Sequence, residues 1–193
     1  MCYKTNSFAS FVSKYKTMRL ATLFITATAA APTTFETENF IMSPDVEWSL
    51  DKDSVMGGSS TCDIERRNDH IHFTGQLNLV GGGFAGFIAQ IENKLSGVDV
   101  IRVSGRTPDP ERTFEINVSR NDRDSGRWYH ALPLGTDYQS FEVKLSDFYF
   151  EYHGQQNPDV PPPFGSQVRR VGINIHDKKS EAFEADINII QGL

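Results

Sequence analysis

Apolar and polar residues alternate at period two along most of the chain. In residues 70–79, Ile71, Phe73, Leu77 and Leu79 share one face of an extended strand, and mostly polar residues form the other. This pattern predicts a half-buried strand. The same alternation predicts strands at residues 114–118, 141–145, 171–175 and 183–189. Denser apolar runs suit central strands at residues 84–91 and 98–103, and residues 127–132 form a weaker candidate.

Turn-forming residues, rather than helical periods, separate these apolar runs. Asn68-Asp69, Gly81–Gly83 and Asn121-Asp122 are examples. Short strands with turn signals between them indicate a sandwich or a barrel, so we predict an all-β, antiparallel domain over residues 35–193. The long connection at residues 149–167 is either a recognition loop or a stiff surface crossover.

Residues 1–34 differ in composition from the remainder and are expected to be a leader that is removed. They carry Lys and Arg but no acidic residue, and their apolar run from Leu20 to Ala31 contains Ala27-Thr28-Ala29. These features fit a secretory signal peptide, with an organellar transit peptide or a disordered tail as alternatives. An extracytoplasmic location is therefore favoured over a mitochondrial or other organellar one. The apolar run is too short to span a membrane, so no integral membrane segment is expected after leader removal.

Composition narrows the possible partners and cofactors. The chain has 193 residues, which suits one domain, and a net charge of −6, which argues against binding to nucleic acid or to anionic membrane surfaces. Its only cysteines are Cys2 and Cys62, so neither a disulfide framework nor a common zinc site is present in the sequence. We expect no metal and no cofactor.

Several residues could carry chemistry, but none completes a catalytic set. His70 and His72 share a strand face, yet a metal site needs three or four ligands, so a solvated face is the alternative. Ser59 and Ser60 lack the Gly-x-Ser-x-Gly frame of a hydrolase. The carboxylates that could form a glycosidase pair, or equally cap turns, are Asp51, Asp53, Asp177 and Asp186. We therefore expect a protein that is not an enzyme.

Aromatic residues and a glycosylation sequence offer two weaker indications. Trp48, Trp128 and Tyr138 could form platforms for a sugar, or they could belong to the core of a sandwich. Asn117-Val118-Ser119 is a glycosylation sequon, which a secreted eukaryotic protein could use, although its place in a predicted strand makes use less favourable.

Two glycine clusters flank the early strands. The first follows Asp53 in Asp53-Ser54-Val55-Met56-Gly57-Gly58-Ser59, and the second is Gly82-Gly83-Phe84-Ala85. Glycine permits positive φ and close approach of another segment. We expect these residues to shape the backbone where the early strands meet.

These strings resemble the thirty-kilodalton complex I intermediate-associated protein family, whose domain is a galactose-binding-like β-sandwich. The resemblance covers nearly everything after Trp48, although residues 105–112 depart from the Gly-Asp-Gly-Arg common in the family. It implies an antiparallel jelly-roll sandwich. It also marks family residues with a structural or binding role: Trp48, Asp53, Met56, Gly57, Gly58, Ser59, Gly82, Gly83, Phe84, Arg102, Gly105 and Asp177.

The resemblance implies a binding module without catalytic activity. Mitochondrial members act as chaperone-like factors that hold an intermediate during assembly of the membrane arm of NADH:ubiquinone oxidoreductase. The implied partner is then a protein. Because galactose-binding-like sandwiches also serve as carbohydrate-binding modules, an extracytoplasmic domain that binds a glycan is the alternative.

Overall fold

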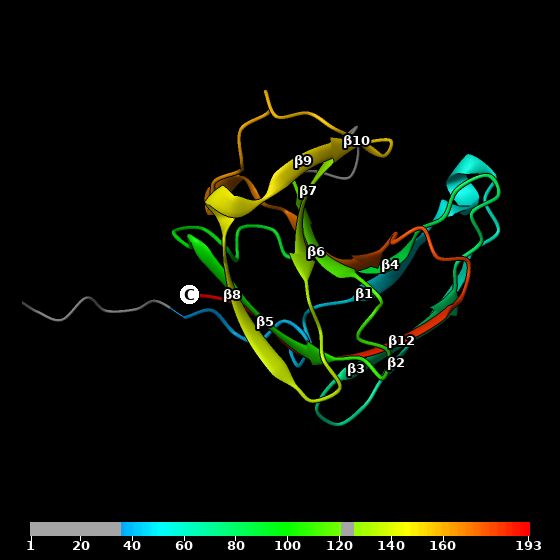
Figure 1. The fold of residues 1–193 in the computed structure, drawn as a ribbon. Helices are drawn as coiled ribbons and strands as arrows, with labels where there is room; N and C mark the ends of the chain where they lie inside the picture. Colours follow the sequence, from blue (N-terminus) through cyan, green and yellow to red (C-terminus); the bar gives the residue numbers. More distant parts are fainter. Residues whose placement is uncertain (1–35, 121–125) are drawn as a thin grey trace, which may run out of the picture. The chain divides into compact units, whose positions relative to one another are not determined.

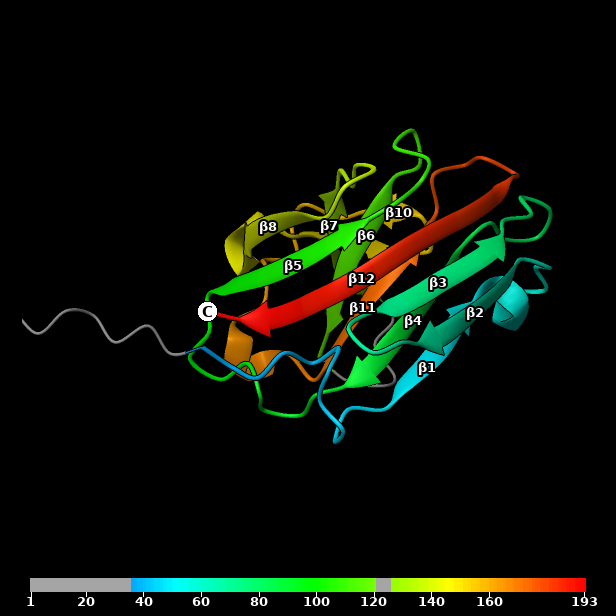
Figure 2. The same ribbon diagram turned by 90° about the horizontal axis from the view of Figure 1, so that it is seen from below.

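The computed structural model describes residues 36–120 and 126–193, and they form two antiparallel sheets packed face to face (Figure 1; Figure 2). The predicted all-β sandwich is confirmed. The predicted leader, residues 1–34, lies outside the described residues. None of the helices in the described part of the chain has the length and apolar character needed to cross a membrane.

In both sheets the spatial order of the strands differs from their order in the sequence. Sheet A contains, in spatial order, β1 (Trp48–Lys52), β4 (Ala85–Gln90), β11 (Arg170–Ile175), β6 (Phe114–Ser119), β7 (Arg127–Leu132), β9 (Tyr149–Tyr152) and β10 (Gln155–Gln156). Sheet B contains β2 (Thr61–Arg66), β3 (Ile71–Gln76), β12 (Ala182–Gly192), β5 (Val100–Arg106) and β8 (Gln139–Lys144). The short 3₁₀ helices are η1 (Asp53–Met56), η2 (Leu145–Asp147) and η3 (Gly165–Gln167).

Alternate residues of both sheets meet in an aromatic core. Phe73 of β3 lies with its ring centroid 5.1 Å from Phe87 of β4 and 4.9 Å from Phe183 of β12. Phe114 of β6 packs edge-on against Phe183. Burial of large rings from facing strands is the main term that holds two sheets together.

Four connections between the sheets lie at the same end of the sandwich. In sheet A, strand pairing aligns Lys52, Ala85, Ile175 and Phe114. In sheet B it aligns Thr61, Gln76 and Ala182. The chain therefore crosses between sheets here in the connections β1–β2, β3–β4, β5–β6 and β11–β12. We call this end the crossover end.

Some predicted boundaries were wrong. Strand β3 ends at Gln76 instead of continuing to residue 79, and Leu79 is 42% exposed. The side chain of Asn78 accepts a hydrogen bond from the Val80 amide, which bends the chain out of the strand. Residues 149–167, predicted as one connection, contain the hairpin of β9 and β10.

Candidate functional site

The carboxylate of Asp53 joins two crossover connections. Asp53 begins η1 and is fully buried. Its Oδ1 accepts the Ser60 amide at 3.0 Å, and its Oδ2 accepts the Ser60 hydroxyl at 2.6 Å and the Gly83 amide at 2.7 Å. Burial opposes ionisation of Asp53, but hydrogen bonds from Ser60, Gly83 and Phe84 outweigh it and lower the pKa of the carboxyl. We call these residues the Asp53 cluster.

The neighbouring glycines leave the space that the Asp53 cluster needs. A Cβ on Gly58 would lie 2.2 Å from Cγ of Asp53, and one on Gly82 would lie 2.4 Å from its Cβ. Gly57 ends η1 with φ at 83°, in the left-handed region. The close approaches of Gly58 and Gly82 to Asp53 require the absence of a side chain. This supports our proposal that these family residues shape the backbone.

The other family residues of these two loops surround the Asp53 cluster. The Ser59 hydroxyl accepts a hydrogen bond from the Asn78 side chain at 2.8 Å. Met56 is exposed, and Phe84 is partly buried. The structure thus brings together eight of the twelve marked residues, from Asp53 to Ser59 and from Gly82 to Phe84.

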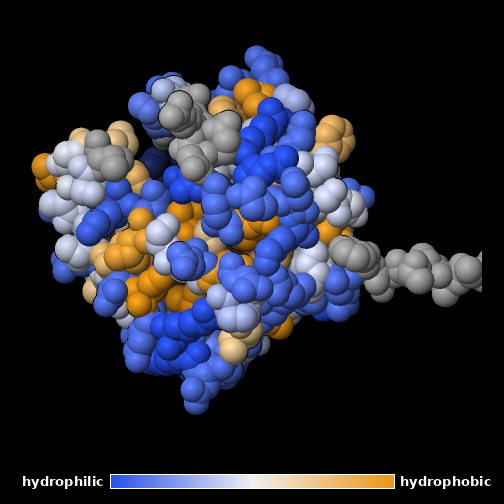
Figure 3. Space-filling view, turned by 180° about the vertical axis from the view of Figure 1, so that it is seen from behind, coloured by the Kyte–Doolittle hydropathy of each residue, from blue (hydrophilic) through white to orange (hydrophobic). Residues whose placement is uncertain are grey.

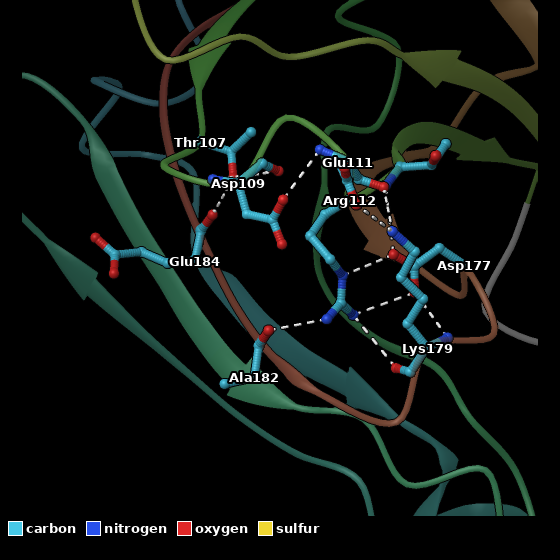
Figure 4. Close-up of polar contacts among 9 residues, drawn as sticks. Thr107, Asp109, Glu111, Arg112, Asp177, Lys179, Ala182 and Glu184 are labelled. Atoms are coloured by element: carbon cyan, nitrogen blue, oxygen red, sulfur yellow. Dashed lines mark hydrogen bonds and ion pairs between the residues drawn. The ribbon is translucent and has the colours of Figure 1, made fainter.

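A second buried carboxylate, Asp177, joins the other two crossover connections (Figure 4). Arg112 donates to both its oxygens, from Nε at 2.7 Å and from Nη2 at 3.1 Å. Arg112 also donates to the carbonyl of Ala182 at 2.8 Å. Arg112 is 1% exposed, so this bidentate pair is shielded from water. We call these residues the Arg112 cluster.

The family resemblance marks Asp177 but not its partner Arg112. Arg112 stands in the stretch that departs from the family pattern, among turn residues that normally lie at the surface. Its one signal was its position two residues before the buried strand residue Phe114. An arginine in a turn gives no indication of burial until the partner connection is known.

The remaining marked residues lie elsewhere. Arg102 of β5 pairs with Glu142 of β8 at 2.9 Å on the outer face of sheet B. A Cβ on Gly105 would lie 2.8 Å from the carbonyl oxygen of Asp186, so this glycine permits close strand packing. The twelve residues therefore do not form a single site.

The two histidines of β3 and its flank meet a carboxylate of sheet B. His72 Nδ1 lies 2.8 Å from Asp186 Oδ1, and His70 Nε2 lies 3.4 Å from the same oxygen. Arg106 donates to the other oxygen at 2.9 Å. Burial raises the pKa of Asp186, but the partners His72 and Arg106 lower it further than burial raises it. Neither this group nor any other set of three or more His, Cys, Asp or Glu residues in the described part of the chain is arranged to hold a metal ion.

Two of the three aromatic candidates do not form sugar platforms of the expected kind. Trp128 is buried, and its indole donates to the Pro161 carbonyl at 3.0 Å, so it belongs to the core. Tyr138 is exposed but lies beneath the Arg106 guanidinium, 4.8 Å from its ring centroid.

Trp48 lines a hollow at the open edge of the sandwich, between β1 and β2. The hollow has a volume of about 360 Å³ and is lined by Val46, Trp48, Ile64, Arg66 and others. Each strand lies at the end of its sheet. The space-filling view from behind shows apolar side chains exposed among polar ones (Figure 3). We call the hollow lined by Trp48 and its neighbours the edge hollow.

The edge hollow has a fixed wall and an indole without a partner. Arg66 donates to the carbonyls of Ile41 at 2.9 Å and Ser43 at 2.8 Å, which fixes the preceding loop. The Trp48 indole nitrogen is buried and has no hydrogen-bond partner among the described residues. Leu50, two residues along the same face of β1, is 40% exposed. These features are typical of a surface that a partner covers.

Sheet A has a second interior, on the side that faces away from sheet B. It curls so far that Arg127 of β7 pairs with Asp51 of β1, although β4, β11 and β6 lie between them (Figure 1). The same face of sheet A carries buried polar side chains, including Asn117, Asn174 and Glu115. We call the group of these five residues and Tyr129 the polar trough.

Hydrogen bonds join part of the polar trough. Glu115 accepts from the Tyr149 hydroxyl, and its other oxygen lies 2.9 Å from Nδ1 of His176. Burial lowers the pKa of His176. The hydrogen bond with Glu115 and the nearby negative charges together raise this pKa by more than burial lowers it, so the pKa of His176 lies above its usual value. Burial also raises the pKa of Tyr129 to about 12. Asn117 is 1% exposed, so its sequon lies out of reach in the folded protein.

The comparisons with known proteins agree on the fold. The model of the complex I intermediate-associated protein 30 family matches residues 34–187. No curated protein matches the chain.

Solved structures similar to the chain share its sandwich. A family 11 carbohydrate-binding module from Clostridium thermocellum, in complex with a β-1,3-1,4-mixed-linked tetrasaccharide, is 10% identical with a TM-score of 0.56; the match covers 82% of this chain and 95% of that one. The family 11 module of a cellulosomal cellulase of Clostridium thermocellum is 9% identical with a TM-score of 0.55, covering 77% and 86%. An agarase is 12% identical with a TM-score of 0.51, covering 80% of this chain and 25% of the agarase. At these identities the likeness concerns the fold alone.

Proposed function

The chain belongs to the complex I intermediate-associated protein 30 family, and from this we propose that it is a non-catalytic domain that binds a protein partner at the edge hollow. The family supplies the class of partner, an assembly intermediate of NADH:ubiquinone oxidoreductase. The observation that supports this binding site is the hollow at the open edge of the sandwich, which is lined by the family residue Trp48.

The edge hollow has the properties that protein recognition requires. The partly exposed Trp48 and Ile64 contribute apolar surface to it, and Arg66 and Glu47 are polar residues of its lining. An apolar anchor in such a recess, surrounded by polar groups, is the usual centre of a protein interface.

Affinity capture from solubilised respiratory membranes tests this function. The tagged full chain is expected to co-purify with subunits of NADH:ubiquinone oxidoreductase. Leu50→Glu places a charge beside the hollow at a position that is already 40% exposed, so it is expected to lose most of the captured subunits while the fold is kept.

A matched control makes the same kind of change away from the hollow. Val80 is 79% exposed on the β3–β4 connection, so Val80→Glu is expected to capture as much as the wild-type chain. Equal capture by both variants, or no capture of these subunits by the wild type, would refute the proposal.

Carbohydrate binding is the second candidate, because family 11 carbohydrate-binding modules share the sandwich of this chain. A glycan array separates the two functions: reproducible sugar binding without capture of respiratory subunits would favour the second.

A further inference from the structure

The connection between β10 and η3 contains three consecutive prolines, Pro161 to Pro163, and Phe164 follows them directly. A proline ring fixes φ at about −65°, and a residue that precedes a proline is held in the extended region. Phe164 continues this conformation, with φ at −80° and ψ at 150°. Residues 160–164 therefore have the extended geometry of polyproline II.

Exposure along this segment follows the three-residue turn of polyproline II. Val160 packs on the core and Pro163 is buried, so these two residues form the inner edge. Pro161 and Phe164 each follow one of them and are exposed, while Pro162 is intermediate. Pro161 and Phe164 therefore share the outward edge, which we call the Pro161–Phe164 ridge.

Hydrogen bonds and close packing hold the Pro161–Phe164 ridge at both ends. The Trp128 indole donates to the Pro161 carbonyl at 3.0 Å. The Phe164 amide donates to Oε1 of Gln167 at 3.2 Å, and the Gln167 amide donates to the Phe164 carbonyl at 2.8 Å. A Cβ on Gly165 would lie 2.1 Å from a backbone carbonyl oxygen, so the chain packs closely on the domain directly after the ridge.

The Phe164 ring points away from the domain in spite of these restraints. It is 70% exposed, and it is the one aromatic ring in the described part of the chain whose exposed fraction exceeds one half. A single exposed apolar side chain is common in soluble proteins. A ring that is exposed at the end of a rigid polyproline II segment is less common, because prolines fix its position before any partner binds.

We propose that the Pro161–Phe164 ridge is the ligand of a partner protein whose groove is lined by aromatic side chains. Such grooves bind polyproline II segments because the ligand is ordered beforehand and loses little conformational entropy. Asp159 is exposed directly before the segment, so a groove with a basic rim fits best. The ridge shares no residue with the edge hollow, and this inference is independent of the function proposed there.

Calorimetric titration of the full chain with purified SH3, WW and EVH1 domains, three classes that have such grooves, tests the proposal. The wild type is expected to bind at least one of these domains. Phe164→Ser removes the ring at a position that is 70% exposed, so the midpoint of urea unfolding should not change. The affinity of this variant for the domain should fall by about tenfold or more.

Val80→Ser is the matched control. It also replaces an exposed apolar side chain by serine, but on the β3–β4 connection at the crossover end. Its affinity for the domain should equal that of the wild type. Failure of the wild type to bind any of the three classes, or equal binding by Phe164→Ser, would overturn the proposal.

Pro162→Gly tests the geometry separately from the ring. It keeps Pro161 and Phe164 but frees the backbone between them, so the affinity should fall about two- to fivefold. An unchanged affinity would mean that the ring binds without the polyproline II segment, which contradicts the proposal.

Two further measurements separate this surface from other interpretations. Sedimentation of the wild type with phosphatidylcholine vesicles, if Phe164→Ser abolishes it, would assign the ring to a membrane surface and overturn the proposal. Leu50→Glu should bind the groove domain as the wild type does, and Phe164→Ser should still capture respiratory subunits. The two binding surfaces can therefore fail separately.

Discussion

At the scale of single residues, glycine was the informative signal. Gly57, Gly58 and Gly82 could be singled out because two adjacent glycines after apolar residues demand an unusual backbone. The structure shows one left-handed residue and two close approaches to Asp53. The partner of Asp53 could not be predicted in the same way, since a serine such as Ser60 has many local alternatives for its hydroxyl.

Gly57→Val is expected to destabilise the domain by ~1–3 kcal/mol. The space at Gly57 is open, with nothing within 4 Å of an added Cβ, so the cost comes only from φ at 83°. The free energy of unfolding from urea titration measures it. Gly57→Asn tolerates this φ better and should recover part of the loss. An unchanged midpoint for Gly57→Val would contradict the assigned strain.

At the scale of elements, alternation predicted the strands that bury one full face. Strands β3, β6, β11 and β12 fall in this class because their inward residues face the opposite sheet, whereas β8 was predicted although only its Val143 is buried. The apolar pattern did not predict β1 and β2, in which no residue is buried. A strand without a buried face carries a weaker apolar pattern.

Asp53→Asn should separate the two connections that the Asp53 cluster joins. An amide nitrogen would face the donors of Ser60 or Gly83, so we expect a loss of about 2–3 kcal/mol at neutral pH. Because folding lowers the pKa of Asp53, its contribution is present above the unfolded pKa and is lost as the pH falls through the folded one.

The difference in unfolding free energy between wild type and Asp53→Asn should therefore shrink below about pH 4, the usual pKa range of aspartate. Urea titrations of both proteins across the acidic range measure it, and other carboxylates cancel in the difference. A constant difference down to pH 2 would show that the charge of Asp53 does not contribute.

At the scale of the molecule, two carboxylates fix the crossover end. Asp53 joins the connections of β1–β2 and β3–β4, and Asp177 with Arg112 joins those of β5–β6 and β11–β12. The sequence predicted a sandwich but neither this arrangement nor the polar trough. Both depend on contacts between segments far apart in the chain, and the trough also depends on the curl of sheet A.

Arg112→Met should destabilise the whole domain by about 3–5 kcal/mol, because it leaves Asp177 buried without its cation. Arg102→Met removes an exposed pair with Glu142 and should cost about 0–1 kcal/mol. Thermal unfolding of the two variants compares them. Similar melting midpoints would mean that the buried Arg112–Asp177 pair stabilises the domain no more than the exposed Arg102–Glu142 pair does.

The Asp53 cluster also bears on how this domain can diversify. Three of the groups that hold Asp53 are backbone amides, those of Ser60, Gly83 and Phe84, and every amino acid except proline supplies such a group. Exposed neighbours such as Met56 and Val80 can therefore be exchanged without loosening the loops. The crossover end is a position where evolution, or a designer, can install a new specificity on an unchanged frame.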